Sequence, residues 1–73
     1  MQNRPAAFLT AYLAERDVVV SDISRLSDGS YEVWAQGQRV NVGAPATAGE
    51  VRAWAQEAAD RVVARLGNRM LPR

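Results

Sequence analysis

Any catalysis by this chain would have to use carboxylates, hydroxyls or arginines, because its 73 residues include no His, Cys or Lys. General acid–base catalysis near neutral pH would need a carboxylate whose pKa is raised in a cleft. Asp22 and Glu32 are the only carboxylates expected on the sheet, and surface charge is the simpler interpretation of both. We therefore expect no enzymatic activity and predict no catalytic residue.

The missing residue types also limit metal and cofactor chemistry. Without Cys there is neither a disulfide framework nor a thiolate zinc site, and the absence of His removes most other transition-metal sites. We predict no metal site and no cofactor. All nine positive charges are arginines. Two explanations remain open, a GC-rich coding bias and selection for planar, bidentate contacts with phosphate or carboxylate.

One tryptophan and its neighbours form the first candidate binding site. We expect Trp34 and Arg39 to face each other across two strands, with Arg25 and Ile23 on the next strand. Trp and Arg are enriched at protein–protein hot spots, and the same pair can stack a nucleic-acid base. The alternatives are a cation–π contact that binds nothing and a homodimer through this face. We take protein-partner binding as the leading hypothesis.

The second candidate is the basic C-terminal end, which carries Arg61, Arg65, Arg69 and Arg73. Arg61 and Arg65 are one helical turn apart on one side of the predicted helix. Cations at this end complement the helix dipole. The functional alternative is an edge that binds nucleic-acid phosphates or an acidic protein surface.

The clearest structural signal is a β-hairpin over residues 31–42. Apolar and polar residues alternate along both arms, and Gln36-Gly37 can form the two-residue turn between them. The face that should meet a core carries Tyr31, Val33, Val40 and Val42. The opposite face carries Glu32, Trp34, Arg39 and Asn41.

An earlier strand is predicted over residues 18–26, because this segment opens with three β-branched residues. With the turn length that we expect, Val18, Val20 and Leu26 lie on its core face. A turn over residues 27–30, with Asp28-Gly29 at its centre, joins this strand to the hairpin.

The length of that turn decides which side chains of the early strand face the core. A two-residue turn would place Arg25 opposite Glu32 and Ile23 opposite Trp34. A three-residue loop would shift the register by one and exchange the faces. We expect the two-residue turn because of the Arg25–Glu32 charge match, although it places Asp22 on the inner face.

A helix is predicted at each end of the chain. The first covers residues 5–15, with an apolar stripe of Phe8, Leu9, Tyr12 and Leu13. The second covers residues 48–66. Thr47 and Glu50 have the spacing of a capping box at its start, and Gly67 is suited to end it. Trp54 lies on its apolar stripe and is expected to anchor the core. Residues 68–73 are predicted to form a flexible basic tail.

These elements predict one α+β domain over residues 1–73, in the order α-β-β-β-α. Two helices can cover one face of a three-stranded antiparallel sheet, and the other face would stay open. This order is similar to that of double-stranded-RNA-binding domains, in which a Lys-rich start of the second helix grips phosphate. Residues 47–52 read Thr-Ala-Gly-Glu-Val-Arg, with one acid and one base. We therefore do not expect RNA to be bound in that way.

In format the whole chain resembles the small phage-encoded regulators that bind a host machine, RNA polymerase among them. What carries the resemblance is a tiny single domain without catalytic groups and with an exposed aromatic-plus-arginine patch. It implies a non-catalytic regulator that binds a surface of a larger assembly, such as the transcription machinery. The alternative is a nucleic-acid-binding domain that uses the Arg-rich C-terminus. The net charge of +1 is too small to favour nucleic acid by itself.

No apolar run approaches the roughly 18 residues of a membrane span, and the first residues do not resemble a signal peptide. We therefore expect a cytoplasmic protein without a membrane partner.

Overall fold

The computed structural model describes residues 4–70, with side chains described for residues 4–67. The elements follow in the order α1 (Arg4–Glu15), β1 (Val20–Arg25), β2 (Tyr31–Ala35), β3 (Gln38–Gly43), a short 3-10 turn η1 (Ala48–Glu50) and α2 (Val51–Met70). The predicted α-β-β-β-α order is confirmed, and the fold is α+β.

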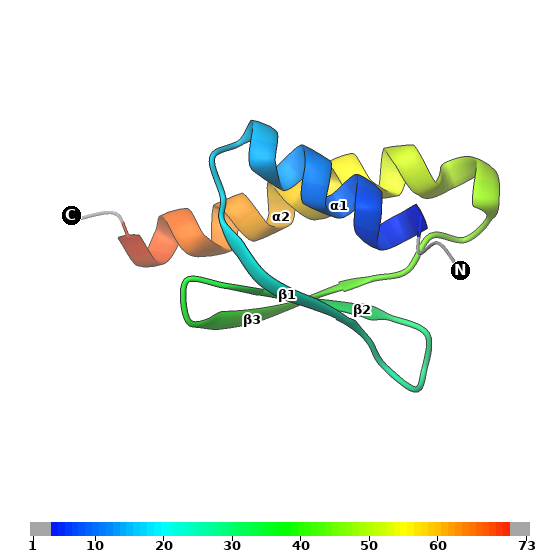
Figure 1. The fold of residues 1–73 in the computed structure, drawn as a ribbon, viewed down its shortest axis with the longest axis horizontal. Helices are drawn as coiled ribbons and strands as arrows, with labels where there is room; N and C mark the ends of the chain where they lie inside the picture. The colour runs from blue at the N-terminus through cyan, green and yellow to red at the C-terminus, as the bar shows by residue number, and fades with distance from the viewer. Residues whose placement is uncertain (1–3, 71–73) are drawn as a thin grey trace.

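The fold has two layers (Figure 1). The strands form an antiparallel sheet in the order β1-β2-β3. Both helices lie on the same side of this sheet and run in the same direction (Figure 1). The predicted arrangement, with one covered and one open sheet face, is therefore confirmed.

The β2–β3 hairpin has the predicted two-residue turn. Ala35 pairs with Gln38, and the two turn residues between them both have positive φ angles, 52° at Gln36 and 76° at Gly37. Two positive φ angles give a turn whose twist matches that of the strands. The four residues predicted for the core face are all buried: Tyr31, Val33, Val40 and Val42.

The β1–β2 connection has a three-residue loop, so the predicted two-residue turn is wrong. The Leu26 N–H donates to the Ser30 carbonyl over 2.8 Å, and the Gly29 N–H donates to the Leu26 carbonyl over 2.9 Å. Gly29 has a φ of 92°, the left-handed conformation that closes a three-residue hairpin loop. The loop residues are therefore 27–29, and the register is one residue away from the expected one.

This register exchanges the faces of β1. Ile23 pairs with Val33 and Arg25 with Tyr31, so both lie on the covered face. Leu26 was predicted for the core face. Because it directly follows Arg25, it lies instead on the side of the sheet that the helices do not cover. The expected Arg25–Glu32 pair does not form, because Glu32 is opposite Ser24.

A β-bulge at the start of β1 returns the preceding residues to the core. The register shifts between the pairs Val20–Ala35 and Asp22–Trp34, which leaves Ser21 as the extra residue. An extra residue reverses the alternation. Val20 therefore packs against the core, as predicted. Asp22 lies after the bulge and pairs with Trp34, so it faces the open side instead of the predicted inner face.

The loop is held by the Asp28 carboxylate. Its Oδ1 accepts hydrogen bonds from the Ser30 hydroxyl over 2.7 Å and from the Ser30 N–H over 2.9 Å. These two bonds stabilise the ionised form, so they hold the pKa of Asp28 below its usual value.

Small residues line the buried face of helix α2. Ala55, Ala58 and Ala59 are all buried there. Trp54 fixes the helix to β3 through its indole N–H, which donates to the Val42 carbonyl over 2.9 Å. Its ring also lies 5.5 Å from that of Tyr31, so the expectation that Trp54 anchors the core is confirmed.

Two details at the ends of α2 differ from the sequence prediction. Thr47 makes no side-chain cap; the Glu50 N–H donates to the Thr47 carbonyl instead, over 3.1 Å, within η1. The helix also continues past Gly67 to Met70, so Gly67 does not end it. The predicted tail therefore has helical backbone over residues 68–70, and residues 71–73 lie outside the described residues.

Replacing Gly29 tests the three-residue loop. We expect Gly29→Ala to lower the free energy of unfolding by about 1–2 kcal/mol, because a residue with a Cβ is strained at positive φ. Gly67→Ala is the matched control, since it lies inside α2 with no atom within 4 Å of an added Cβ. It should stabilise the protein by about 0.5–1 kcal/mol. Urea unfolding followed by circular dichroism measures both, and equal effects would contradict the assigned loop.

Candidate functional site

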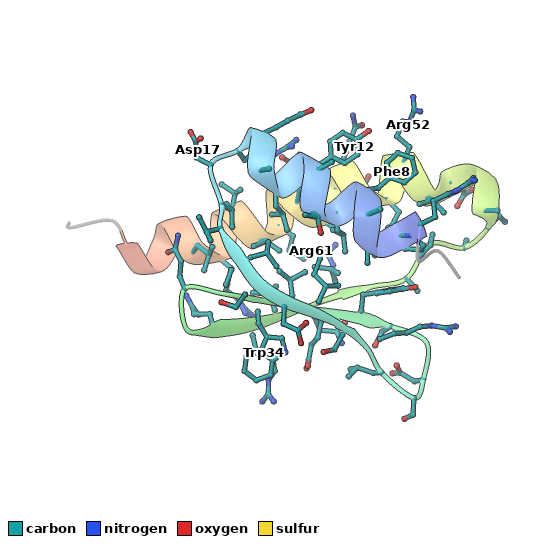
Figure 2. All side chains as sticks on the ribbon, viewed as in Figure 1. Phe8, Tyr12, Asp17, Trp34, Arg52 and Arg61 are labelled. Atoms are coloured by element: carbon teal, nitrogen blue, oxygen red, sulfur yellow. The ribbon has the colours of Figure 1, made fainter. Side chains whose placement is uncertain are left out.

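The candidate site is the sheet surface turned away from the helices, which we call the open face. The pairings place its side chains in two rows across the three strands. One row is Asp22, Trp34 and Arg39, and the other is Ser24, Glu32 and Asn41. Figure 2 shows Trp34 projecting from this side, opposite the helices.

Trp34 and Arg39 form the cation–π contact that the sequence analysis gave as an alternative for this pair. The guanidinium carbon of Arg39 lies 5.3 Å from the centre of the Trp34 ring. The same side chain forms an ion pair with Glu32 at 3.6 Å. The Trp34 side of the open face is therefore ordered by contacts between β2 and β3, and 39% of Trp34 remains exposed.

Polar contacts occupy the end of the open face near the first hairpin loop. The Asn41 side-chain amide donates to the Ser30 hydroxyl over 3.2 Å, and its carbonyl oxygen accepts from the Gly43 N–H over 2.9 Å. Because Ser30 also holds Asp28, Asn41 connects β3 to the β1–β2 loop. We assign these side chains to the fold.

Asp22 differs from the other charged residues of the open face. Its Oδ2 accepts a hydrogen bond from the Ser24 hydroxyl over 3.2 Å. No cation pairs with it among the described side chains, in which the ion pairs are Arg16–Asp60 and Arg39–Glu32. Asp22 lies directly opposite Trp34, so an unneutralised carboxylate stands beside the exposed indole.

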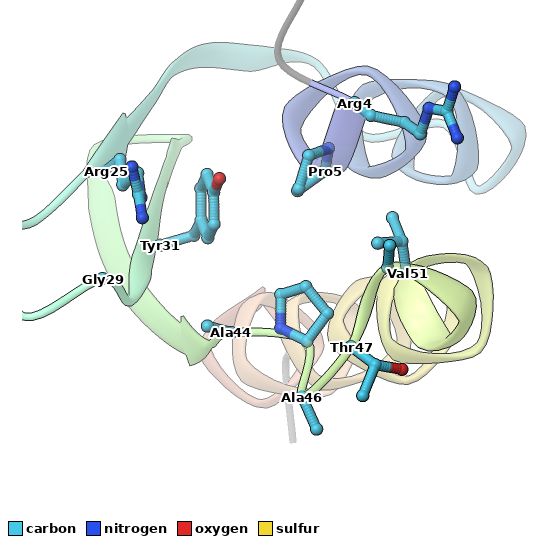
Figure 3. Close-up of a pocket in the computed structure, with 11 residues that line it drawn as sticks. Arg4, Pro5, Arg25, Gly29, Tyr31, Ala44, Ala46, Thr47 and Val51 are labelled. Atoms are coloured by element: carbon cyan, nitrogen blue, oxygen red, sulfur yellow. The ribbon is translucent and has the colours of Figure 1, made fainter.

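Two of the four predicted partner-binding residues are therefore brought together and two are not. Trp34 and Arg39 share the open face, whereas Ile23 packs against the core. Arg25 lies at a hollow of about 460 Å³ between the sheet end and the helices (Figure 3). Tyr31 and Pro5 line this hollow, whereas the Arg4 guanidinium points away from Tyr31 (Figure 3).

Sequence reasoning did not assign Asp22 to the open face. The signal that could have done so is Gly29, which suits the third position of a three-residue loop. It also did not single out Val19, which is 79% exposed. Val19 lines a separate hollow of about 420 Å³ with Thr10 and Ala14 of α1.

Of the predicted basic C-terminal residues, the structure describes the side chains of Arg61 and Arg65. Arg61 and Arg65 are exposed on α2, and Figure 2 shows Arg61 on the helix side, away from Trp34. The side chain of Arg69 and the whole of Arg73 lie outside the described residues. The two basic side chains that are described therefore form a surface distinct from the open face.

The two carboxylates on the strands of the open face lie outside the hollows described above. Asp22 and Glu32 are diagonal neighbours across β1 and β2, and neither lines the hollow at the sheet end or the one beside Val19. Among the described residues, no cluster of three acidic side chains could hold a metal ion. In the same part of the chain, no helix is long and apolar enough to span a bilayer.

Comparisons with protein-family models, curated proteins and solved structures found no match to this chain.

The two tryptophans should respond differently to the same substitution. Trp34→Phe is expected to lower the free energy of unfolding by about 1 kcal/mol or less, because it loses mainly an exposed cation–π contact. Trp54→Phe is expected to cost about 1–3 kcal/mol, because it leaves the Val42 carbonyl without its partner. Urea unfolding followed by circular dichroism tests this. A larger loss from Trp34→Phe would show that Trp34 serves the fold.

Proposed function

We propose that this protein is a non-catalytic regulator that binds a surface of a larger protein assembly through its open face. The observation that carries the proposal is the position of Trp34. This residue leaves 39% of its surface exposed on a face that the helices do not cover. Trp and Arg in such a position are the residues most enriched at binding hot spots.

The contacts around Trp34 also favour binding energetically. Arg39 lies against the ring and is itself paired with Glu32, so the indole is held in place before any partner arrives. A side chain that is already ordered loses less entropy on association. The open face therefore offers a partner a large, preorganised apolar contact.

An exposed Trp34 with Arg39 against its ring supports a regulator that works by occupying a surface of its partner. We propose the transcription machinery, RNA polymerase included, as the first assembly to test, and the cytoplasm as the location. In this role Trp34 and Arg39 make the contact, and the covered face and helices provide the scaffold.

Capture of a partner from lysate tests the proposal. We expect the tagged protein to retain a specific partner, identified by mass spectrometry, and Trp34→Ala to reduce that capture at least tenfold, as removal of a hot-spot residue does. Val19→Ala is the matched control, because it also removes an exposed apolar side chain but lies outside the open face, and it should capture the partner normally.

Circular dichroism should show that both variants remain folded. Failure to recover any partner would refute the proposed function. Equal recovery by Trp34→Ala and the unaltered protein would refute the role of the open face.

A second candidate function is nucleic-acid binding by the basic side of α2. It is favoured by one observation: Arg61 and Arg65 are both exposed, and neither takes part in the ion pairs of the described side chains. Phosphate contacts by arginine release counterions, so binding would weaken steeply with salt.

A gel-shift assay tests this candidate. If it is correct, duplex DNA or RNA should be retarded at low salt, and the double substitution Arg61→Gln and Arg65→Gln should weaken binding about tenfold or more. No retardation of the unaltered protein at low salt would exclude it.

A further inference from the structure

The charges of the open face indicate the chemistry of its partner. Among the described side chains on the strands of the open face, Asp22 and Glu32 are acidic and Arg39 is basic. Asp28 adds a carboxylate in the adjoining β1–β2 loop. The chain as a whole has a net charge of +1. Negative charge is therefore concentrated on this surface of an otherwise basic molecule.

Of the two carboxylates on the strands of the open face, the described ion pairs leave only that of Asp22 without a cation. The Nε of Arg39 lies 3.6 Å from the Oε2 of Glu32, so these two charges compensate each other. Asp22 has no cationic partner among the described side chains and lies opposite Trp34 on the neighbouring strand. The exposed indole thus has a bound cation toward β3 and an uncompensated carboxylate toward β1.

These two groups attract the same kind of side chain. An aromatic ring attracts a cation through its quadrupole, and indole does so best. A carboxylate attracts a cation by direct charge and can hold a guanidinium through paired hydrogen bonds. A lysine or arginine of a partner would gain both contacts at once between Trp34 and Asp22.

The same charges disfavour the other occupants of this face. Nucleic-acid phosphates would meet an excess of carboxylates. A second copy of this chain, docked face to face, would bring the same acidic surface against itself, and like charges across an interface are costly.

We propose that the open face receives a basic segment of a partner protein, with an arginine or lysine side chain seated between the Trp34 indole and the Asp22 carboxylate. This inference rests on the proposed function and names the chemistry of the partner. Arg39 is not displaced in this arrangement, because its contacts lie toward β3.

Two synthetic octapeptides serve as probes, one of alternating arginine and leucine and one of alternating glutamate and leucine. Binding is followed through the two indole N–H signals in ¹⁵N-correlated NMR spectra. Trp34→Phe assigns them, and Trp54, whose N–H is bonded to the Val42 carbonyl, reports that the fold is intact. We expect saturable movement of the Trp34 signal with the basic peptide only, while the Trp54 signal stays in place.

Asp22→Asn should weaken binding of the basic peptide about threefold or more, the range of one exposed ion pair with an added aromatic contact. The asparagine keeps an oxygen that can accept the Ser24 hydrogen bond, so the strand should be undisturbed. Glu57→Gln is the control: it removes the same charge from an exposed position on α2 and should leave the affinity unchanged.

Several results would overturn the inference. They are an unmoved Trp34 signal at millimolar basic peptide, equal binding of the acidic peptide, or full affinity in Asp22→Asn. In the lysate experiment, a partner whose capture needs Trp34 but not Asp22 would overturn this inference and leave the proposed function standing. Absence of any captured partner would refute the proposed function itself.

Discussion

The arrangement of the first hairpin depends on one backbone conformation, the positive φ of Gly29. That conformation closes a three-residue loop, and the loop length sets which residues of β1 meet β2. A change of one residue exchanges the two faces of a strand. Gly29 therefore places Ile23 in the core and Asp22 beside Trp34. The bulge at Ser21 then allows Val18 and Val20 to face the core as well, although they are out of phase with Ile23.

The second hairpin could be predicted from the sequence because two independent signals agree there. Alternation along residues 31–42 and the Gln36-Gly37 turn specify the same register, and four buried residues on one face follow from it. This register holds from the Ala35–Gln38 pair to the Glu32–Asn41 pair, but an irregularity then pairs Tyr31 with Gly43 instead of the expected Val42. The first hairpin could not, because its two signals conflict. The Arg25–Glu32 match is a surface charge pair, worth about 1 kcal/mol or less. Loop geometry and burial of Ile23 outweigh such a pair, so the charge match was the wrong guide.

The same conflict explains which parts of the candidate site were predictable. Trp34 and Arg39 belong to the hairpin with the clear pattern, and both lie where alternation places them. The faces of Ile23 and Arg25 depend on the length of the first loop, and both residues lie on the covered face.

At the ends of α2, local sequence signals were also misleading. Thr47 and Glu50 have capping-box spacing, but a 3-10 turn satisfies the Glu50 N–H through the Thr47 carbonyl. Gly67 lies within α2, which continues to Met70, because a glycine can adopt helical backbone as well as end a helix.

The contrast between the two tryptophans shows what the Arg39–Glu32 pair does. Trp54 is anchored by its hydrogen bond to a strand carbonyl, and packing against Tyr31 covers it. Trp34 is more exposed and has the Arg39 guanidinium over its ring. The Arg39 side chain is 61% exposed, so its pair with Glu32 adds little stability. Its clearer effects are on the surface: it orients the indole and neutralises Glu32. Glu32 is neutralised by Arg39 and Asp22 has no cation among the described side chains. The uncompensated carboxylate on the open-face strands therefore lies on the β1 side of the indole and the guanidinium on the β3 side. The amino-acid composition alone does not specify this asymmetry.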